Sequence, residues 1–279
     1  MKRAKIILFG LAILCFSAIG TLAQTSNIIK KDLSQAEIDR IVKTFTTNEA
    51  KFRDALTGYV FDRSANFQTL GMGGQVSGVY RRDSFMSLTA DGRRLEKISY
   101  FPIPTTSVVT NEDLEDLGGV TPFALEPSAI SQYNFTYVGK EKIDELELYV
   151  FDVTPKVIPD PKKSKLRLFT GRVWVEDKDL MIVKSRGKAV PETKDNKFPI
   201  VETWRENVDG KYWFPSYASS DDELVFDSGD SYKIKLRVKY NNYRVGRSEV
   251  RILDDNEETK EETPPAKPVA SPTPTPKKP

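Results

Sequence analysis

The chain has 279 residues, 39% hydrophobic and 29% charged, which is enough for one sizeable domain or two small ones. It contains no histidine and a single cysteine, Cys15. This composition argues against histidine-based proton transfer, thiolate nucleophiles and zinc-thiolate sites. The formal net charge of +2 gives no general electrostatic case for nucleic acid. We therefore predict a non-enzymatic protein with no catalytic residue, metal site, cofactor or nucleic-acid partner.

The N-terminus has the layout of a secretory signal peptide, in which cations precede an apolar run that ends in small residues. Lys2, Arg3 and Lys5 stand before the run over residues 6–23. We expect cleavage near Ala23, which would make residues 1–23 a signal peptide and the protein an exported one. The alternative is an uncleaved membrane anchor, but this run is short for a membrane span and is interrupted by glycine and hydroxyl residues.

A polar leader over residues 24–33 is followed by Ser34 and Glu37, the S-x-x-E pattern of a capping box at the start of a helix. Apolar side chains then recur at helical spacing until Thr57 and Gly58. This stripe consists of Ile38, Ile41, Val42, Phe45, Phe52 and Leu56. An amphipathic helix of this kind needs an apolar partner, and a sheet face is the natural one.

From Tyr59 onward the apolar residues recur with the period of two that is typical of strands. Turn dipeptides such as Asp91-Gly92 and Asp209-Gly210 separate the segments. A short helix over residues 111–117 interrupts the series. We predict an α+β fold dominated by one large, curved antiparallel sheet with short meander connections. The predicted strands span residues 59–70, 75–90, 93–101, 133–142, 146–154, 166–176, 180–189, 200–208, 211–219, 224–226 and 231–243.

The last of these segments, residues 231–243, is the most regular strand pattern in the chain. Its apolar residues are Tyr232, Ile234, Leu236, Val238 and Tyr240, and they alternate with Lys233, Lys235, Arg237 and Lys239. Successive side chains of a strand point to opposite faces, so one face would be buried and the other exposed to solvent. We expect the cations to point outward, whereas the apolar side chains face either a packed core or a bound ligand.

Many aromatic residues fall in the predicted C-terminal strands, among them Trp174 and Trp204. One interpretation is ordinary core and cross-strand packing. The other is the lining of an apolar ligand cavity inside a curved sheet. The two interpretations can hold at different positions.

Several segments match functional motifs only in part. Residues 71–76 begin like a dinucleotide loop but lack its third glycine and lead into a strand, so we expect a turn. Ser185 and Lys188 have S-x-x-K spacing, but in a strand they point to opposite faces. The acidic runs 112–116 and 221–223 lack the ligand spacing of a calcium loop. A carboxylate-dependent hydrolase stays open as a third hypothesis, although no acidic pair stands out.

Past Asp255 the composition changes. Residues 257–279 hold seven of the 17 prolines, four glutamates and four lysines, with almost nothing to bury. We predict a folded domain over residues 34–254 and a disordered, proline-rich tail over residues 255–279. The tail is either simply solvated, or a spacer or contact to envelope proteins or cell-wall polymer.

Four phrases in the predicted strands resemble a known family. They are YVGKE at residues 137–141, YVFDVTPK at 149–156, GRVWVE at 171–176 and VDGKYWFP at 208–215. Together with the element order, they are similar to the outer-membrane lipoprotein-sorting family, called LolA-like, over about residues 35–245.

The resemblance implies a periplasmic half-barrel whose concave apolar face, covered by the N-terminal helix and the short helical insertion, holds acyl chains. The implied partner is a lipid or a lipoprotein acyl chain, bound by a monomer. On this basis the candidate ligand-binding residues are Tyr232, Ile234, Leu236, Val238, Tyr240, Trp174 and Trp204. The alternative is an envelope scaffold or sensing module in which the same face is a filled core.

Overall fold

The computed structural model describes residues 27–89, 94–106, 130–164, 166–194 and 196–246. The predicted signal peptide (1–23), the short helix (111–117) and the proline-rich tail (255–279) lie outside the described residues.

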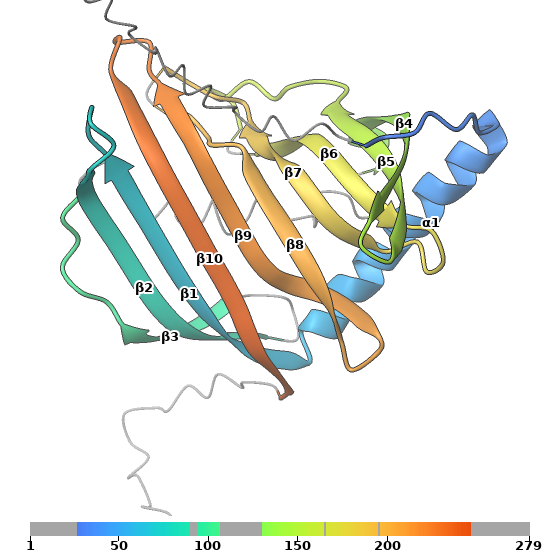
Figure 1. Cartoon of the computed structure of the whole chain (residues 1–279), viewed down its shortest axis with the longest axis horizontal. Coiled ribbons are helices and arrows are strands. Elements are labelled where there is room, and N and C mark those ends of the chain that lie inside the picture. The colour runs from blue at the N-terminus through green and yellow to red at the C-terminus, as the bar shows by residue number, and fades with distance from the viewer. Residues whose placement is uncertain (1–26, 90–93, 107–129, 165, 195, 247–279) are drawn as a thin grey trace, which may run out of the picture.

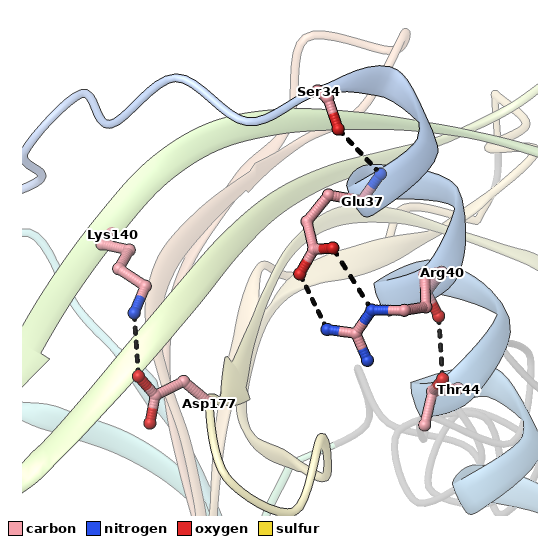
Figure 2. A network of polar contacts seen from close by, with 6 residues as sticks. All are labelled: Ser34, Glu37, Arg40, Thr44, Lys140 and Asp177. Carbon is pink, nitrogen blue, oxygen red and sulfur yellow. Dashed lines mark hydrogen bonds and ion pairs between the residues drawn. The ribbon is translucent and has the colours of Figure 1, made fainter.

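Helix α1 (Gln35–Leu56) begins where the capping pattern predicts. The Ser34 hydroxyl accepts a hydrogen bond from the backbone N–H of Glu37 at 3.2 Å (Figure 2). The Glu37 carboxylate accepts hydrogen bonds from the Arg40 guanidinium at 2.8 and 3.3 Å. The predicted capping box is therefore present only in its first hydrogen bond, the one accepted by the Ser34 hydroxyl. The Glu37 carboxylate pairs with Arg40, one turn further along the helix, instead of the backbone N–H of Ser34.

Ten strands follow the helix and form a single sheet (Figure 1). They are β1 (Tyr59–Leu70), β2 (Val76–Leu88), β3 (Arg94–Tyr100), β4 (Tyr133–Ile143), β5 (Leu146–Pro155), β6 (Leu168–Glu176), β7 (Ile182–Val190), β8 (Val201–Val208), β9 (Tyr212–Val225) and β10 (Ser231–Val245). A 3₁₀ turn, η2 (Ile130–Gln132), precedes β4. The predicted α+β half-barrel with one large antiparallel sheet is confirmed.

The strand order across the sheet is β3-β2-β1-β10-β9-β8-β7-β6-β5-β4. Chain neighbours are therefore sheet neighbours except for β3 and β4, which form the two opposite edges. Strands β1 and β10 pair antiparallel although they lie at opposite ends of the folded chain. In this pairing Phe67 lies opposite Leu236 and Ala65 opposite Val238. The meander prediction holds for β1–β3 and for β4–β10, and the β1–β10 pairing joins these two halves.

Strand β9 corrects the prediction of two separate strands over residues 211–219 and 224–226. The acidic residues 221–223 continue the strand because their carboxylates have partners. Asp221 pairs with Arg237 on β10, the Asp222 carboxylate accepts from the backbone N–H of Ile200 at 2.8 Å, and Glu223 accepts from the Ser231 hydroxyl at 2.8 Å. Partners of this kind offset the low strand propensity of aspartate.

The hairpin turns agree with the turn residues of the sequence. Asp209 and Gly210 have φ angles of 54° and 67° between β8 and β9, and the Lys211 N–H donates to the Val208 carbonyl across this turn at 3.1 Å. Residues 71–76 turn from β1 into β2, with the Gly71 N–H donating to the Gln75 carbonyl at 2.8 Å. The predicted turn in place of a nucleotide loop is present.

Helix α1 lies across one face of the sheet, on the side of β4–β9 (Figure 1). We call this the helix-side face and the opposite one the outer face. Ile41, Val42 and Phe45 belong to an apolar cluster with residues of β4–β7, whereas Phe52 and Leu56 pack with Tyr59, Phe61 and Phe214. In the described part of the chain, no helix is long and apolar enough to cross a membrane.

Candidate ligand-binding face

The strands β1, β2, β8, β9 and β10 carry an apolar cluster of their own on the helix-side face. Among the described residues, none from α1 belongs to it. Phe67 lies between Tyr80 of β2 and Leu236 of β10 in the strand register. We call the cluster the distal apolar layer; its buried members are Ala65, Phe67, Tyr80, Val201, Ala218, Leu224, Ile234, Leu236 and Val238.

Helix α1 is fastened beside this layer by a buried ion pair. Both oxygens of Glu49 accept hydrogen bonds from the guanidinium of Arg205 on β8, each at 2.8 Å, and the two side chains are 0% and 1% exposed. The guanidinium also lies 4.2 Å from the centre of the Phe52 ring. Burial raises the pKa of the Glu49 carboxyl, and the Arg205 charge opposes that shift.

Asn48, on the same turn, donates from its amide to the carbonyls of Asp179 and Leu180 at 3.0 Å. A bidentate arginine–carboxylate pair fixes geometry as well as charge. Helix α1 is therefore a fixed wall of the site.

Arg63 lies on β1 at the border between α1 and the distal apolar layer. It follows Phe61 by two residues and is directly opposite Ser84 of β2 and Tyr240 of β10, so its side chain is on the helix-side face. Only 8% of the residue is exposed. In the part of the chain that the structure describes, its guanidinium has no hydrogen-bond or ion-pair partner. Its nitrogens are not among the buried side-chain atoms that lack a partner, so the guanidinium still reaches solvent at this border.

Further polar groups lie next to Arg63 on the same face. Arg82 donates to Glu96 at 2.6 Å, and the Ser84 hydroxyl donates to the other oxygen of that carboxylate at 2.5 Å. The Nε atom of Arg82 and the hydroxyl of Tyr80 are buried and make no hydrogen bond of good geometry. Burial opposes the charge of Arg82, but interactions with the Tyr80 hydroxyl and the Glu96 carboxylate raise its pKa overall. This edge of the apolar layer thus carries two arginines and one carboxylate, and among the described residues Glu96 forms an ion pair with Arg82 only. The local excess of positive charge suits an anionic group.

The structure brings some of the predicted site residues together. Ile234, Leu236 and Val238 are 1%, 1% and 3% exposed and belong to the distal apolar layer, with Tyr240 packed against it. Tyr232 is 37% exposed, and its ring meets Phe226 edge-on at 5.8 Å. Ile234, Leu236, Val238 and Tyr240 therefore share one apolar environment, whereas Tyr232 lies outside it at the start of β10.

Trp174 and Trp204 lie on the outer face, away from this layer. Between them is the ammonium group of Lys184, 4.7 Å from the Trp174 ring and 4.2 Å from the Trp204 ring. Lys184 and Trp204 both contact Glu202, at 3.2 and 2.8 Å. Trp174, Lys184 and Trp204 therefore form a cross-strand ladder over β6, β7 and β8, in which cation–π contacts hold the lysine between the two rings.

Arg63 and Glu49 are the residues that the sequence reading missed. Each interrupts an otherwise apolar pattern: Arg63 stands among Phe61, Ala65 and Phe67 in β1, and Glu49 lies on the apolar stripe of the helix. The sequence does contain a signal for both residues, namely a charged residue at a position where the strand or helix pattern expects an apolar one. Among the described residues no group of three or more His, Cys, Asp or Glu is placed to hold a metal ion.

The fold and this face define an open antiparallel half-barrel with a fixed helix, an apolar layer and a buried arginine at its border. No protein-family model matches the chain, and no curated protein sequence matches it significantly. Among solved structures, the chain is similar to a LolA superfamily protein from Nitrosomonas europaea, at 13% identity and a TM-score of 0.36, over 78% of this chain and 94% of that one.

Two further structures are similar to the chain. One is a putative outer-membrane lipoprotein-sorting protein domain from Vibrio parahaemolyticus, with 13% identity, a TM-score of 0.35 and coverage of 77% and 96%. The other is a DUF1329 family protein from Desulfovibrio piger, with 14% identity, a TM-score of 0.35 and coverage of 72% and 91%. The family inferred from the sequence phrases recurs in these names. At such identities the likenesses concern the fold alone.

Proposed function

We propose that the protein is an exported, non-enzymatic carrier that binds the acyl chain of a lipid or lipoprotein along the distal apolar layer. The observation that carries this proposal is Arg63, 8% exposed and without an ion-pair partner in the described residues, at the border of the distal apolar layer. An amphiphile has the same two parts, an apolar chain and a polar or anionic head.

The apolar chain supplies the affinity. Each methylene moved from water onto an apolar surface gains about 0.8 kcal/mol. The cluster offers aliphatic and aromatic side chains from five strands, among them Phe67, Leu236 and Val238. Because the members of this layer are at most 9% exposed, an acyl chain would have to displace what covers them. It would then bind mainly by desolvation, with little demand on its exact length.

The head supplies orientation. A carboxylate or phosphate beside Arg63 would turn an uncompensated cation into a charge-assisted pair, and such pairs are stronger in a buried place than in water. The Arg82 guanidinium, already paired with Glu96, would add to the positive charge around the head. We expect anionic amphiphiles to bind more tightly than neutral ones of equal length.

The test combines native mass spectrometry of the purified protein with titration of a fluorescent fatty acid and its methyl ester. We expect co-purified acyl lipid and saturable binding, with the free acid tighter than the ester. A protein that co-purifies without lipid and gives no saturable response with either probe would contradict the carrier proposal.

The near-complete burial of Ile234, Leu236 and Val238 favours a second candidate, an envelope scaffold whose helix-side face is a filled core. Deletion of residues 257–279 separates the two functions. A scaffold positioned by its tail should lose its location in the envelope while ignoring acyl probes. A carrier should keep its probe affinity after the deletion.

A further inference from the structure

The outer face carries a polar trough on the side opposite the distal apolar layer. It has a volume of roughly 270 Å³ and spans β2, β1 and β10. Strand β1 provides a floor of short, uncharged side chains, whereas longer cationic side chains rise from the neighbouring strands. We call this the outer trough; its lining residues are Ser64, Asn66, Gln68, Arg81, Lys235, Arg237 and Lys239.

The strand register explains the shape of the outer trough. Asn66 lies directly between Arg81 of β2 and Arg237 of β10, and Gln68 lies beside Lys235. Directly opposed side chains on one face are only about 4.5–5.5 Å apart at Cβ. A short residue between two long ones therefore leaves a depression along β1.

The charge of the outer trough is one-sided. Four of its seven lining residues are cations and none is acidic. Arg81 is paired with Asp83 at 2.9 Å and Arg237 with Asp221. Lys235 is 4.0 Å from Asp221, and Lys239 has no partner among the described residues. Lys239 thus retains an unneutralised charge at the rim, and Lys235 shares the carboxylate of Asp221 with Arg237. Asn66 and Gln68 offer amide donors along the floor.

The chain itself contains a segment complementary to this surface. Residues 254–262, DDNEETKEE, hold six acidic residues and one lysine. They follow β10, which forms one wall of the outer trough and ends at Val245. Lys239 and Lys235 precede Val245 by six and ten residues, or about 20 and 33 Å along the strand at 3.3 Å per residue.

The linking residues are long enough for a return along the outer face. Residue 254 is nine positions beyond Val245 and residue 262 is seventeen, so an extended chain reaches about 30–56 Å. Every residue of the segment can therefore reach back the roughly 20 Å to Lys239, and all but its first residue can reach the roughly 33 Å to Lys235. We propose that the acidic segment 254–262 lies in the outer trough and pairs with Lys235 and Lys239, shielding the cationic part of the outer face. This inference is independent of the acyl-carrier proposal.

A spin label tests the contact in the purified protein with its complete C-terminal tail. Thr259→Cys introduces a thiol into a chain whose only cysteine, Cys15, lies in the predicted signal peptide. At low salt a nitroxide at this position should broaden the backbone amide signals of β1 and β10 around Asn66, Lys235 and Lys239. The broadening should fade at high salt, because exposed charges are then screened.

The decisive variant combines Lys235→Gln with Lys239→Gln, and the matched control combines Lys162→Gln with Lys163→Gln in an exposed loop. Exposed ion pairs contribute up to about 1 kcal/mol, so each trough lysine should change the bound-to-free ratio of the tail by about twofold to fivefold. The control should leave the broadening unchanged. Broadening that survives in the trough variant, or that appears at other strands, would overturn the proposal.

Two further outcomes would also overturn it. Broadening that arises only when labelled chains are mixed with unlabelled, isotope-enriched chains would assign the contact to a second copy. Binding of phosphatidylglycerol vesicles through Lys235 and Lys239, with no broadening from the label, would assign the outer trough to a lipid surface instead.

Discussion

Glu49 and Arg205 are the two charged residues that hold helix α1 on the sheet. Their side chains are 0% and 1% exposed, and the two hydrogen bonds between them measure 2.8 Å each. Desolvating two charges is costly, so the pair is not a source of large net stability compared with an apolar pair. Its effect is to fix one position of the helix, because neither charge tolerates burial alone.

We expect Glu49→Gln to destabilise the protein by about 3–5 kcal/mol, because it leaves the Arg205 charge buried and uncompensated. Urea denaturation measures the loss. The double variant Glu49→Leu with Arg205→Met is the matched control and should recover most of the stability. A double variant no more stable than Glu49→Gln would contradict this account of the pair.

Arg63 presents a different case, since the residue is 8% exposed and its charge has no partner in the described residues. We expect Arg63→Met to change the free energy of unfolding by less than about 1 kcal/mol, since the guanidinium reaches solvent and has no partner to lose in the described residues. The same change should weaken binding of the fluorescent fatty acid but not of its methyl ester. Thermal denaturation and the two titrations measure these effects.

Arg63→Lys is the control that preserves the charge, and it should keep the preference for the acid. A loss of stability in Arg63→Met, with both probes unaffected, would mean that Arg63 has only a structural role.

At the scale of the elements, the contact between β6 and β7 depends on two glycines. Gly171 and Gly187 lie directly opposite each other in the register. A Cβ atom on Gly187 would stand 2.3 Å from the Thr170 carbonyl oxygen and 2.6 Å from the Phe169 ring. The segment that resembled an S-x-x-K motif is therefore better explained by close backbone packing around Gly187 than by Ser185 or Lys188.

We expect Gly187→Ala to destabilise the protein by about 1–3 kcal/mol, because the new methyl group meets backbone that cannot move freely. Gly210→Ala is a useful comparison, since a Cβ there meets nothing within 4 Å and only its φ of 67° is unfavourable. Chemical denaturation of both variants decides the point. A Gly187→Ala protein as stable as the parent would contradict the predicted clash.

A bulge in β10 explains why two of its tyrosines contact one residue. The pairing with β1 shifts between Val60 and Asp62, and Asn242 has a φ of 55° at this place. Tyr240 and Tyr243 both pack against Phe61, with ring centres 6.2 and 5.0 Å away. The strict alternation of residues 231–243 ends here, because an extra residue changes which face follows.

For the whole molecule, an unclosed sheet leaves two edges, β3 and β4, that must not recruit other chains. The N-terminal segment protects part of the β4 edge. Ile29 and Lys140 exchange two backbone hydrogen bonds, at 2.7 and 2.9 Å. The Lys140 side chain donates to Asp177 at 2.8 Å beyond the end of β6 (Figure 2). The leader thus has a structural role in the folded protein.

We expect Ile29→Pro to expose this edge, because proline removes the N–H that donates to the Lys140 carbonyl. The loss of about one hydrogen bond should cost about 1 kcal/mol and increase self-association at high protein concentration. Denaturation and light scattering measure the two effects. Ile29→Ala is the control, since the side chain is 71% exposed. Equal behaviour of the two variants would show that the backbone pairing is dispensable.

The sequence by itself determined the local structure of this protein. The cap at Ser34, the period of two in the strands, and the Asp-Gly turn at residues 209–210 each depend on interactions within a few residues, so a single stretch of chain specifies them. The alternation in β10 likewise separated the apolar residues of the layer from the cations of the outer trough.

Only the tertiary structure decided which distant segments meet. The pairing of β1 with β10, and the contact of Glu49 with Arg205 across 156 positions, depend on packing summed over the whole sheet. A local sequence pattern cannot predict these contacts, because loop closure and burial depend on the complete chain. The same holds for Arg63: the sequence shows a charge in an apolar strand, and only the fold buries it beside the distal apolar layer.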